Sequence, residues 1–178
     1  IGIAEKIDTP AVIENCENKG HISSPSMADY DVYYFGGIAG KVNGAFTLRN
    51  CVNRGNLTAA VERDIAGIAV SGGNDAVFEN CENYGNITVA PNHKPNEGDR
   101  WRPCVAGIVA IENDVTTTIT NCTSDCVIDA TVYRATSIDK VYVFQKTWEN
   151  GTEDTKTVCD EASKSNSAGT TINITTRE

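Results

Sequence analysis

Long apolar runs, basic charge and histidine are all scarce in this sequence. No stretch of 18 apolar residues occurs, so we expect no membrane insertion in this segment. Lys and Arg number 15 against 24 Asp and Glu, and this net charge of -9 argues against a nucleic-acid partner, which needs a basic face. No basic leader with an apolar stretch opens the chain. We expect a mature or excised segment that is part of a larger chain.

What the sequence does contain is an internal repeat. The pattern Asn-Cys-x-Asn-x-Gly occurs three times and a degenerate copy follows, with the cysteines at Cys16, Cys51, Cys81 and Cys122. A Gly-Ile-Ala/Val element precedes each copy, starting at Gly2, Gly37, Gly67 and Gly107. The spacing from glycine to cysteine is 14, 14, 14 and 15 residues, which indicates four equivalent structural units over residues 1–131.

The repeats are rich in Gly, Asn, Thr, Val and Ile, which favour strands and turns over helix. We predict an all-β fold, a parallel β-helix or β-solenoid of about four coils with three short strands per copy. Turns are expected at Asn43-Gly44 and at the glycine that ends each Asn-x-Gly element. Insertions of variable length fall between one copy and the next, so they should form lateral loops on one side of the stack.

Stacked coils would place equivalent side chains in columns, about 4.8 Å apart. Three apolar columns are expected inside, formed by Ile3, Ile38, Ile68 and Ile108, by Ile13, Leu48, Phe78 and Ile119, and by Ile22, Leu57, Ile87 and Ile128. The four repeat cysteines should form a fourth column, and Asn18, Asn53 and Asn83 an amide ladder. On the outside, Glu14, Arg49 and Glu79 should alternate in charge on adjacent coils.

Residues 132–178 depart from the repeat pattern. Residues 141–148 alternate like a strand, and residues 149–152 suggest a hairpin turn before a polar tail. We therefore predict a C-terminal β cap with a hairpin that covers the last coil. No comparable cap is visible at the other end, which suggests further protein or another cover before the first coil.

The pairing of Gly36-Gly-Ile-Ala-Gly40 with the following Asn-Cys-x-Asn-x-Gly resembles GLUG-type repeats of bacterial secreted and surface proteins, including the repeat region of IgA-specific metallopeptidases. The resemblance covers about residues 1–131. It implies a right-handed β-helix, an extracellular or cell-surface location, and a spacer or adhesive role without catalysis. Gly40 becomes Val70 and Ala110 in later copies, and no active-site residue of that family maps onto this chain.

Seven cysteines raise the possibility of metal or disulfide chemistry. An odd number excludes complete internal pairing, and the stacking of four copies already accounts for most of them, so we predict structural thiols, no metal site and no cofactor. A disulfide between Cys126 and Cys159 is the best pairing that remains open. Neither His21 nor His93 has a nucleophile at a recognisable spacing, so we assign no catalytic residue.

Two loops between copies, residues 23–34 and 90–103, carry the candidate contact residues. Aromatic and basic side chains in these positions suit stacking on sugars or contact with a host or surface protein, and the candidates are Tyr30, Tyr33, Tyr34, Arg100, Trp101 and Arg102. Packing of the same rings against the solenoid is the alternative. The resulting hypothesis is a non-enzymatic, adhesin-like surface module. A polysaccharide lyase or hydrolase, or a carbohydrate-binding module, is the second hypothesis, because such enzymes also use parallel β-helices.

Overall fold

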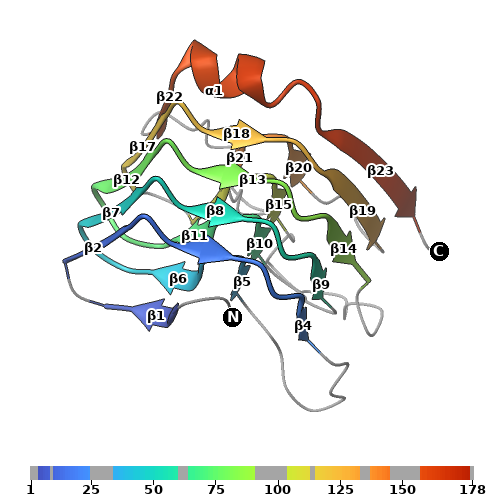
Figure 1. Ribbon diagram of the computed structural model, residues 1–178, viewed down its shortest axis with the longest axis horizontal. Helices are drawn as coiled ribbons and strands as arrows, with labels where there is room; N and C mark the ends of the chain where they lie inside the picture. The colour runs from blue at the N-terminus through green and yellow to red at the C-terminus, as the bar shows by residue number, and fades with distance from the viewer. Residues whose placement is uncertain are drawn as a thin grey trace, which may run out of the picture.

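A computed structural model describes residues 4–8, 10–24, 34–59, 64–90, 104–112, 115–132, 137–144 and 157–176. Within them the chain forms five parallel sheets and one short helix (Figure 1). The strands of successive turns pair side by side, which confirms the expected all-β architecture of a parallel β-helix. No helix in these ranges is long and apolar enough to cross a membrane.

The five sheets, E, A, B, C and D, follow one another along each turn of the chain. Sheet A contains β1 (Ala4–Ile7), β6 (Ala39–Val42), β11 (Ala69–Ser71), β16 (Val109–Ile111) and β21 (Tyr142–Phe144). Sheet B contains β2 (Ala11–Glu14), β7 (Phe46–Arg49), β12 (Ala76–Glu79), β17 (Thr117–Thr120) and β22 (Thr157–Cys159). Sheet C contains β3 (Glu17–Asn18), β8 (Val52–Asn53), β13 (Glu82–Asn83) and β18 (Thr123–Ser124).

Sheets D and E complete the turn. Sheet D contains β4 (Ile22–Ser24), β9 (Leu57–Ala59), β14 (Ile87–Val89), β19 (Val127–Val132) and β23 (Thr171–Thr176). Sheet E contains β5 (Tyr34–Gly36), β10 (Asp64–Ala66), β15 (Cys104–Ala106) and β20 (Ser137–Asp139). We number the coils one to five as β1–β4, β5–β9, β10–β14, β15–β19 and β20–β23. Coils two to four have five strands each, so the prediction of three strands per copy was wrong.

The extra strands arise at glycine corners. Gly36 and Gly37 lie at the corner between β5 and β6. Glycine is needed at both positions because neither has room for a side chain. A Cβ on Gly36 would lie 2.0 Å from the carbonyl oxygen of Ala39, and one on Gly37 would lie 2.2 Å from that of Gly67. The sequence motif Gly-Ile-Ala therefore marks a corner between two strands, where a single strand had been expected.

Residues 137–144 and 157–176 form a fifth coil, which is the β cap over coil four, and the hairpin turn predicted at residues 149–152 lies outside the described residues. Strand β21 pairs in parallel with β16, and β22 pairs in parallel with β17, so these two neighbours along the chain lie in different sheets. Strand β23 then pairs with β19 over six residues. In sheet C a helix covers coil four in place of a strand: α1 (Glu161–Asn166) lies over β18, where a fifth strand would otherwise pair.

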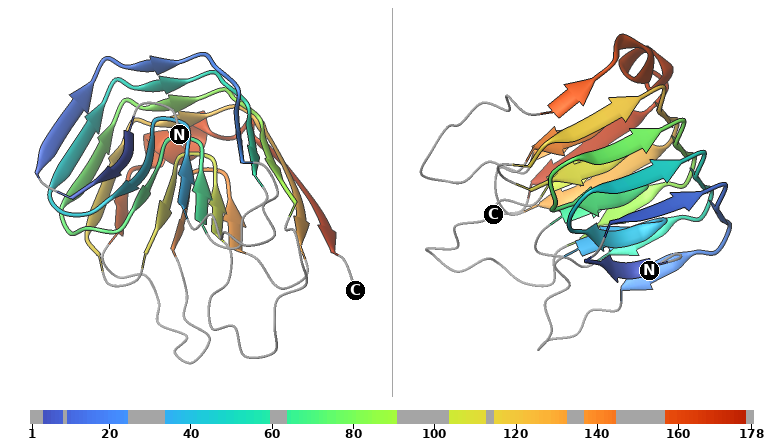
Figure 2. Two further views of the ribbon diagram at one scale, coloured as in Figure 1. Left: turned by 90° about the horizontal axis from the view of Figure 1, so that it is seen from below. Right: turned by 90° about the vertical axis from the view of Figure 1, so that its left-hand side faces the viewer.

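The core lies between the sheets of each coil. Seen along the stack, sheets B, C and D curve around sheets E and A (Figure 2). Sheets A and B enclose one apolar cluster, and sheets E and D enclose a second. A third cluster of small side chains fills the angle on the opposite face of sheets E and A; its buried members are Ala66, Val70, Cys104, Ala106, Ala110 and Val143.

The expected columns are confirmed for the described residues. Ile38, Ile68 and Ile108 are fully buried and joined by backbone hydrogen bonds, and Val141 continues the column in coil five. Ile13 pairs with Leu48, Leu48 with Phe78, and Phe78 with Ile119. The third column runs in register through Ile22, Leu57, Ile87, Ile128 and Ile172. Ile3 lies outside the described residues. Each buried side chain contributes about 1.5–3 kcal/mol, and it does so only when the next coil covers it.

Candidate functional site

The strand ends that flank the four connections between sheets D and E lie on one side of the stack. Ser24 is in register with Ala59, and the first two connections begin after these residues. The four connections end at residues that are in register with one another, namely Tyr34, Asp64, Cys104 and Ser137. The anchor strands of residues 25–33 and 91–103 are thus two coils apart, about 10 Å at the usual strand spacing. This agrees with the prediction that both candidate loops arise at one corner, with the shorter connection 60–63 between them.

Of the six contact candidates, only Tyr34 is among the described residues. Tyr30, Tyr33, Arg100, Trp101 and Arg102 lie outside them. Tyr34 is half-buried at the start of β5, next to the small side chains that fill the angle between sheets E and A. The ammonium of Lys41 lies 4.1 Å from the centre of its ring, so one ring face is already covered.

Lys41 and Glu112 complete a charged cluster around Tyr34, which the sequence did not reveal. Lys41 Nζ lies 2.8 Å from Glu112 Oε2, and both side chains are at least four-fifths buried. Burial and the Glu112 carboxylate raise the pKa of Tyr34. Burial disfavours the charged form of Lys41, but hydrogen bonds to Glu112 and Tyr34 outweigh it and raise the pKa of this ammonium. The cluster therefore holds a neutral phenol and a protonated lysine at neutral pH.

The inner asparagine ladder is present as predicted. Asn18 Nδ2 donates to Asn53 Oδ1, and Asn53 Nδ2 donates to Asn83 Oδ1, both at 2.8 Å. Each of these Nδ2 groups also donates to the carbonyl oxygen of the glycine two residues later. Asn53 and Asn83 are fully buried, so the ladder supplies hydrogen-bond partners to amide groups whose burial would otherwise cost free energy.

The degenerate fourth copy closes this ladder. Ser124 and Cys126 replace the second Asn and the Gly of the motif, and Asn83 Nδ2 donates to Cys126 Sγ at 3.4 Å. Thr170 Oγ1, from coil five, donates to the Ser124 carbonyl oxygen at 2.7 Å. Cys126 therefore has a structural role at the end of the ladder.

The four repeat cysteines also stack as predicted. Cys51, Cys81 and Cys122 each donate from Sγ to a backbone carbonyl of the preceding coil, at 3.4–3.6 Å. The neighbouring Cys122 thiol and burial raise the pKa of Cys81 to about 12, and the neighbouring Cys81 thiol and burial raise that of Cys51 further. The thiols of Cys51 and Cys81 are therefore protonated and unreactive at neutral pH.

The disulfide between Cys126 and Cys159 is not formed. None of the seven cysteines is in a disulfide, and Cys159 belongs to sheet B, where it pairs with Ile119, while Cys126 lies at the corner between sheets C and D. Among the described residues, no group of three or more His, Cys, Asp or Glu side chains is placed to hold a metal ion.

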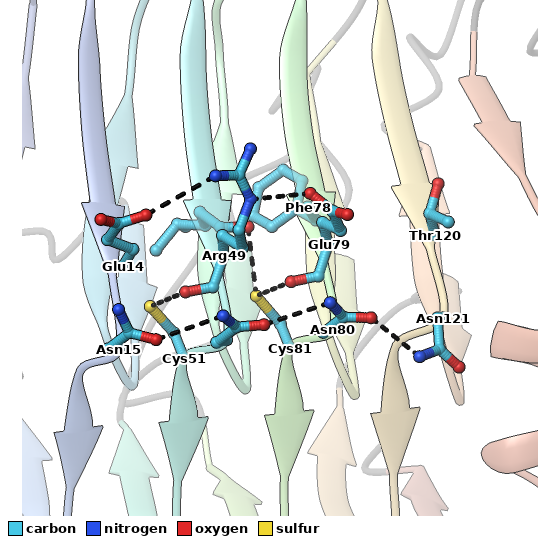
Figure 3. A network of polar contacts seen from close by, with 12 residues as sticks. Glu14, Asn15, Arg49, Cys51, Phe78, Glu79, Asn80, Cys81, Thr120 and Asn121 are labelled. Carbon is cyan, nitrogen blue, oxygen red and sulfur yellow. Dashed lines mark hydrogen bonds and ion pairs between the residues drawn. The ribbon is translucent and has the colours of Figure 1, made fainter.

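A second asparagine ladder runs along the outer corner between sheets B and C, and it was missed at the level of sequence. The amide of each member donates to the Oδ1 of the preceding one, through Asn15, Asn50, Asn80 and Asn121 (Figure 3). The amide of Asn166 in helix α1 donates to Asn121 Oδ1 in the same way. The first four have φ between 49° and 56°, a left-handed conformation that asparagine tolerates. Its signal was the asparagine directly before every repeat cysteine.

The predicted charge alternation on the outside of sheet B is confirmed. Arg49 Nε lies 2.8 Å from Glu79 Oε2, and an Arg49 terminal nitrogen lies 3.6 Å from Glu14 Oε2 (Figure 3). Both acidic groups of this face are therefore paired with the same base. This arrangement differs from a cleft in which two carboxylates face a substrate.

Comparison of the chain with protein-family models, with curated proteins and with solved structures gave no match to any of them.

Proposed function

We propose that this chain is a rigid, non-catalytic β-helical module of a secreted or cell-surface protein, which acts as a spacer and presents contact loops along one side. The observation that carries the proposal is that the buried polar side chains form hydrogen bonds between coils. Asn53, Asn83 and Ser124 donate to or accept from neighbouring coils. Side chains that serve as rungs between coils are committed to the stack and are not presented to a substrate.

The same ladders support a role as a spacer. Three apolar columns, two amide ladders and the cysteine column connect each coil to the next along the stack axis. Opening one coil boundary would break all of these contacts together, because the rungs lie side by side in one coil interface. Such coupling between neighbours resists local bending and unfolding.

The loops carry the proposed contacts with a glycan or a surface protein. Residues 25–33 and 91–103 contain five of the six candidate residues, and both connections are anchored at the same edge of sheets D and E. Tyr34 is assigned to packing instead, because Lys41 covers one face of its ring. Rings and arginines held on a stiff scaffold bind with little loss of conformational entropy.

The chain offers its own short replacement for these loops. Residues 60–63 join Ala59 to Asp64, and these two residues are in register with Ser24 and Tyr34. Replacing residues 25–33 by a copy of 60–63 should therefore remove the first loop without strain. For the second loop, residues 91–103 would be replaced by a copy of 61–63, because Val89 is in register with Ala59.

The test compares the parent chain, the two loop-shortened variants and Tyr34→Phe on an array of glycans and extracellular proteins. We expect binding by the parent and by Tyr34→Phe, and loss of binding with an unchanged melting temperature in at least one loop variant. Release of shortened or unsaturated sugars would establish the alternative, a polysaccharide-active enzyme. Absence of binding by the parent, or equal binding by all variants, would refute the contact role of the loops.

A further inference from the structure

The first coil has one face that no described coil covers. Ile7, Ile13 and Cys16 are only partly buried, whereas Val42, Leu48 and Cys51, which occupy the same columns in coil two, are fully buried. The apolar columns of the stack therefore reach this face with one side exposed. Figure 1 shows it along β1 and β2, the strands at one end of the stack.

Backbone donors on this face are arranged as at the inner coil boundaries. Val52 N–H donates to the carbonyl oxygen of Cys16, and Arg54 N–H donates to that of Asn18, each at 2.8 Å. Glu17 is in register with Val52, and Lys19 occupies the position of Arg54. The N–H groups of Glu17 and Lys19 thus point away from coil two, toward the side where no described coil lies.

The outer amide ladder is open at the same face, and at the other end it continues onto helix α1. Asn166 of helix α1 donates to Asn121 Oδ1, beyond coil four. Asn15 accepts from Asn50, but its own amide has no ladder acceptor among the described residues. The first coil therefore presents an unused amide donor in line with the ladder.

Gly20 shows most directly what this face is shaped to receive. A Cβ built on Gly55 would lie 1.9 Å from the Gly20 carbonyl oxygen, and one on Gly85 would lie 2.0 Å from that of Gly55. At these corners the glycine is needed because the carbonyl of the adjoining coil packs against it. A Cβ on Gly20 would meet nothing closer than Asn18 Oδ1 at 3.7 Å. Gly20 presents the same surface without a side chain, but no carbonyl of a described residue packs against it.

We propose that this face of coil one is a docking surface for a further β-coil of the same repeat class. The strands of that coil run parallel to β2, β3 and β4, its turn carbonyl sits on Gly20, and an asparagine of it accepts from the amide of Asn15. The chemistry of the occupant follows from the interface between coils one and two, which has the same columns and ladders. The surface is separate from the contact loops, and its test does not depend on them.

A second copy of this chain fits the surface poorly. In a head-to-tail arrangement the incoming end would be coil five, where α1 lies over β18 and no strand of sheet C is present among the described residues to pair with β3. In a head-to-head arrangement the strands would run antiparallel, and two Asn15 amide donors would meet. Only a coil of the same polarity matches the donors, the columns and Gly20 together.

The experiment adds such a coil to the full chain. A copy of residues 37–66 replaces Ile1 and precedes Gly2, which reproduces the natural junction between Ala66 and Gly67. We expect the melting temperature to rise by about 5 °C or more, and alkylation of Cys16 to slow at least about tenfold, toward the rate of Cys51. A fusion whose added coil carries Leu48→Asp serves as the control, since it cannot complete the apolar column.

Gly20→Ala separates docking from general stability. The variant should leave the melting temperature of the unfused chain unchanged, because the added Cβ is in open space. In the fusion it should abolish both the stabilisation and the protection of Cys16, because the Cβ would strike the docked carbonyl. Equal protection with and without Gly20→Ala would overturn the proposal, and so would a fused coil that gives no protection. Dimers of the unfused chain that Gly20→Ala dissociates would also overturn it, in favour of a second copy.

Discussion

The ion pair between Lys41 and Glu112 joins the second coil to the fourth and passes over the third. It can do so because Gly72 stands between them: a Cβ there would lie 2.4 Å from Lys41 Cε and 2.7 Å from Glu112 Oε2. The adjacent Gly73 has a different constraint, since its Cβ would lie 1.6 Å from the backbone nitrogen of Gly44. Two neighbouring glycines therefore serve a side-chain contact and a backbone contact respectively.

This difference predicts unequal costs for two alanine substitutions. Gly72→Ala should displace only side-chain ends, those of Lys41, Glu112 and Asn43, and lower the free energy of unfolding by about 1 kcal/mol or less. Gly73→Ala should force coils two and three apart at a backbone contact, and cost about 2–3 kcal/mol. Urea denaturation of both variants measures the difference. Equal costs for the two would contradict the distinction between a side-chain contact at Gly72 and a backbone contact at Gly73.

The repeat could be predicted from the sequence because its two motifs recur in register, and the structure shows why they recur together. A Cβ on Gly37 would lie 2.5 Å from the Asn53 Cγ, and one on Gly67 would lie 2.4 Å from the Asn83 Cγ. The glycine corner of one motif thus packs against the inner asparagine of the other, across the coil. The near-constant spacing of 14 or 15 residues keeps these two corners opposite each other.

The fifth coil could not be predicted from the motif because its contacts are made by other residues. Helix α1 replaces the strand that would carry the Asn-Cys pattern, and its side chains satisfy the edge of coil four: Ser163 Oγ accepts from Cys122 N–H, and Ser167 Oγ accepts from Ser124 N–H. The Lys41–Glu112 pair was equally hidden, since its partners lie two coils apart and the residues in register with Lys41 in coils three and four, Val70 and Ala110, are apolar.

The two asparagine ladders should respond differently to mutation. Asn53→Ala removes two donated bonds and leaves the fully buried Asn83 Oδ1 without its ladder donor, so we expect a loss of about 3 kcal/mol. Asn50→Gly removes exposed amide bonds but suits the φ of 52°, so we expect a change within about 0.5 kcal/mol. Chemical denaturation provides the comparison. A larger effect at Asn50 would mean that the outer ladder dominates stability.

Thiol reactivity should follow position in the stack. Cys16 and Cys159 are partly exposed, while the other five cysteines are buried. Burial raises the pKa of Cys159 to about 11, which slows its reaction at neutral pH even where it is accessible. We expect iodoacetamide to modify Cys16 first and Cys159 slowly, and to leave the rest unmodified until the protein unfolds. Mass spectrometry of the native protein after short labelling tests this order, and early labelling of Cys81 would contradict the stacked column.

Asp160 should make the attachment of α1 dependent on pH. Its carboxylate caps the helix by accepting a hydrogen bond from Ser163 N–H at 2.8 Å, and it also accepts one from Asn121 N–H at 2.9 Å. A third hydrogen bond comes from the Ser163 hydroxyl. The three bonds lower the pKa of Asp160, and the bond from the hydroxyl has the largest effect. A depressed pKa in the folded state stabilises the fold above the unfolded value, near 3.9, and this stabilisation is lost as the pH falls through the folded value. Asp160→Asn should therefore cost up to about 1 kcal/mol at pH 7 and almost nothing at pH 2. Urea titrations across this range provide the measurement, and a cost of Asp160→Asn that is the same at both pH values would rule out the charged cap.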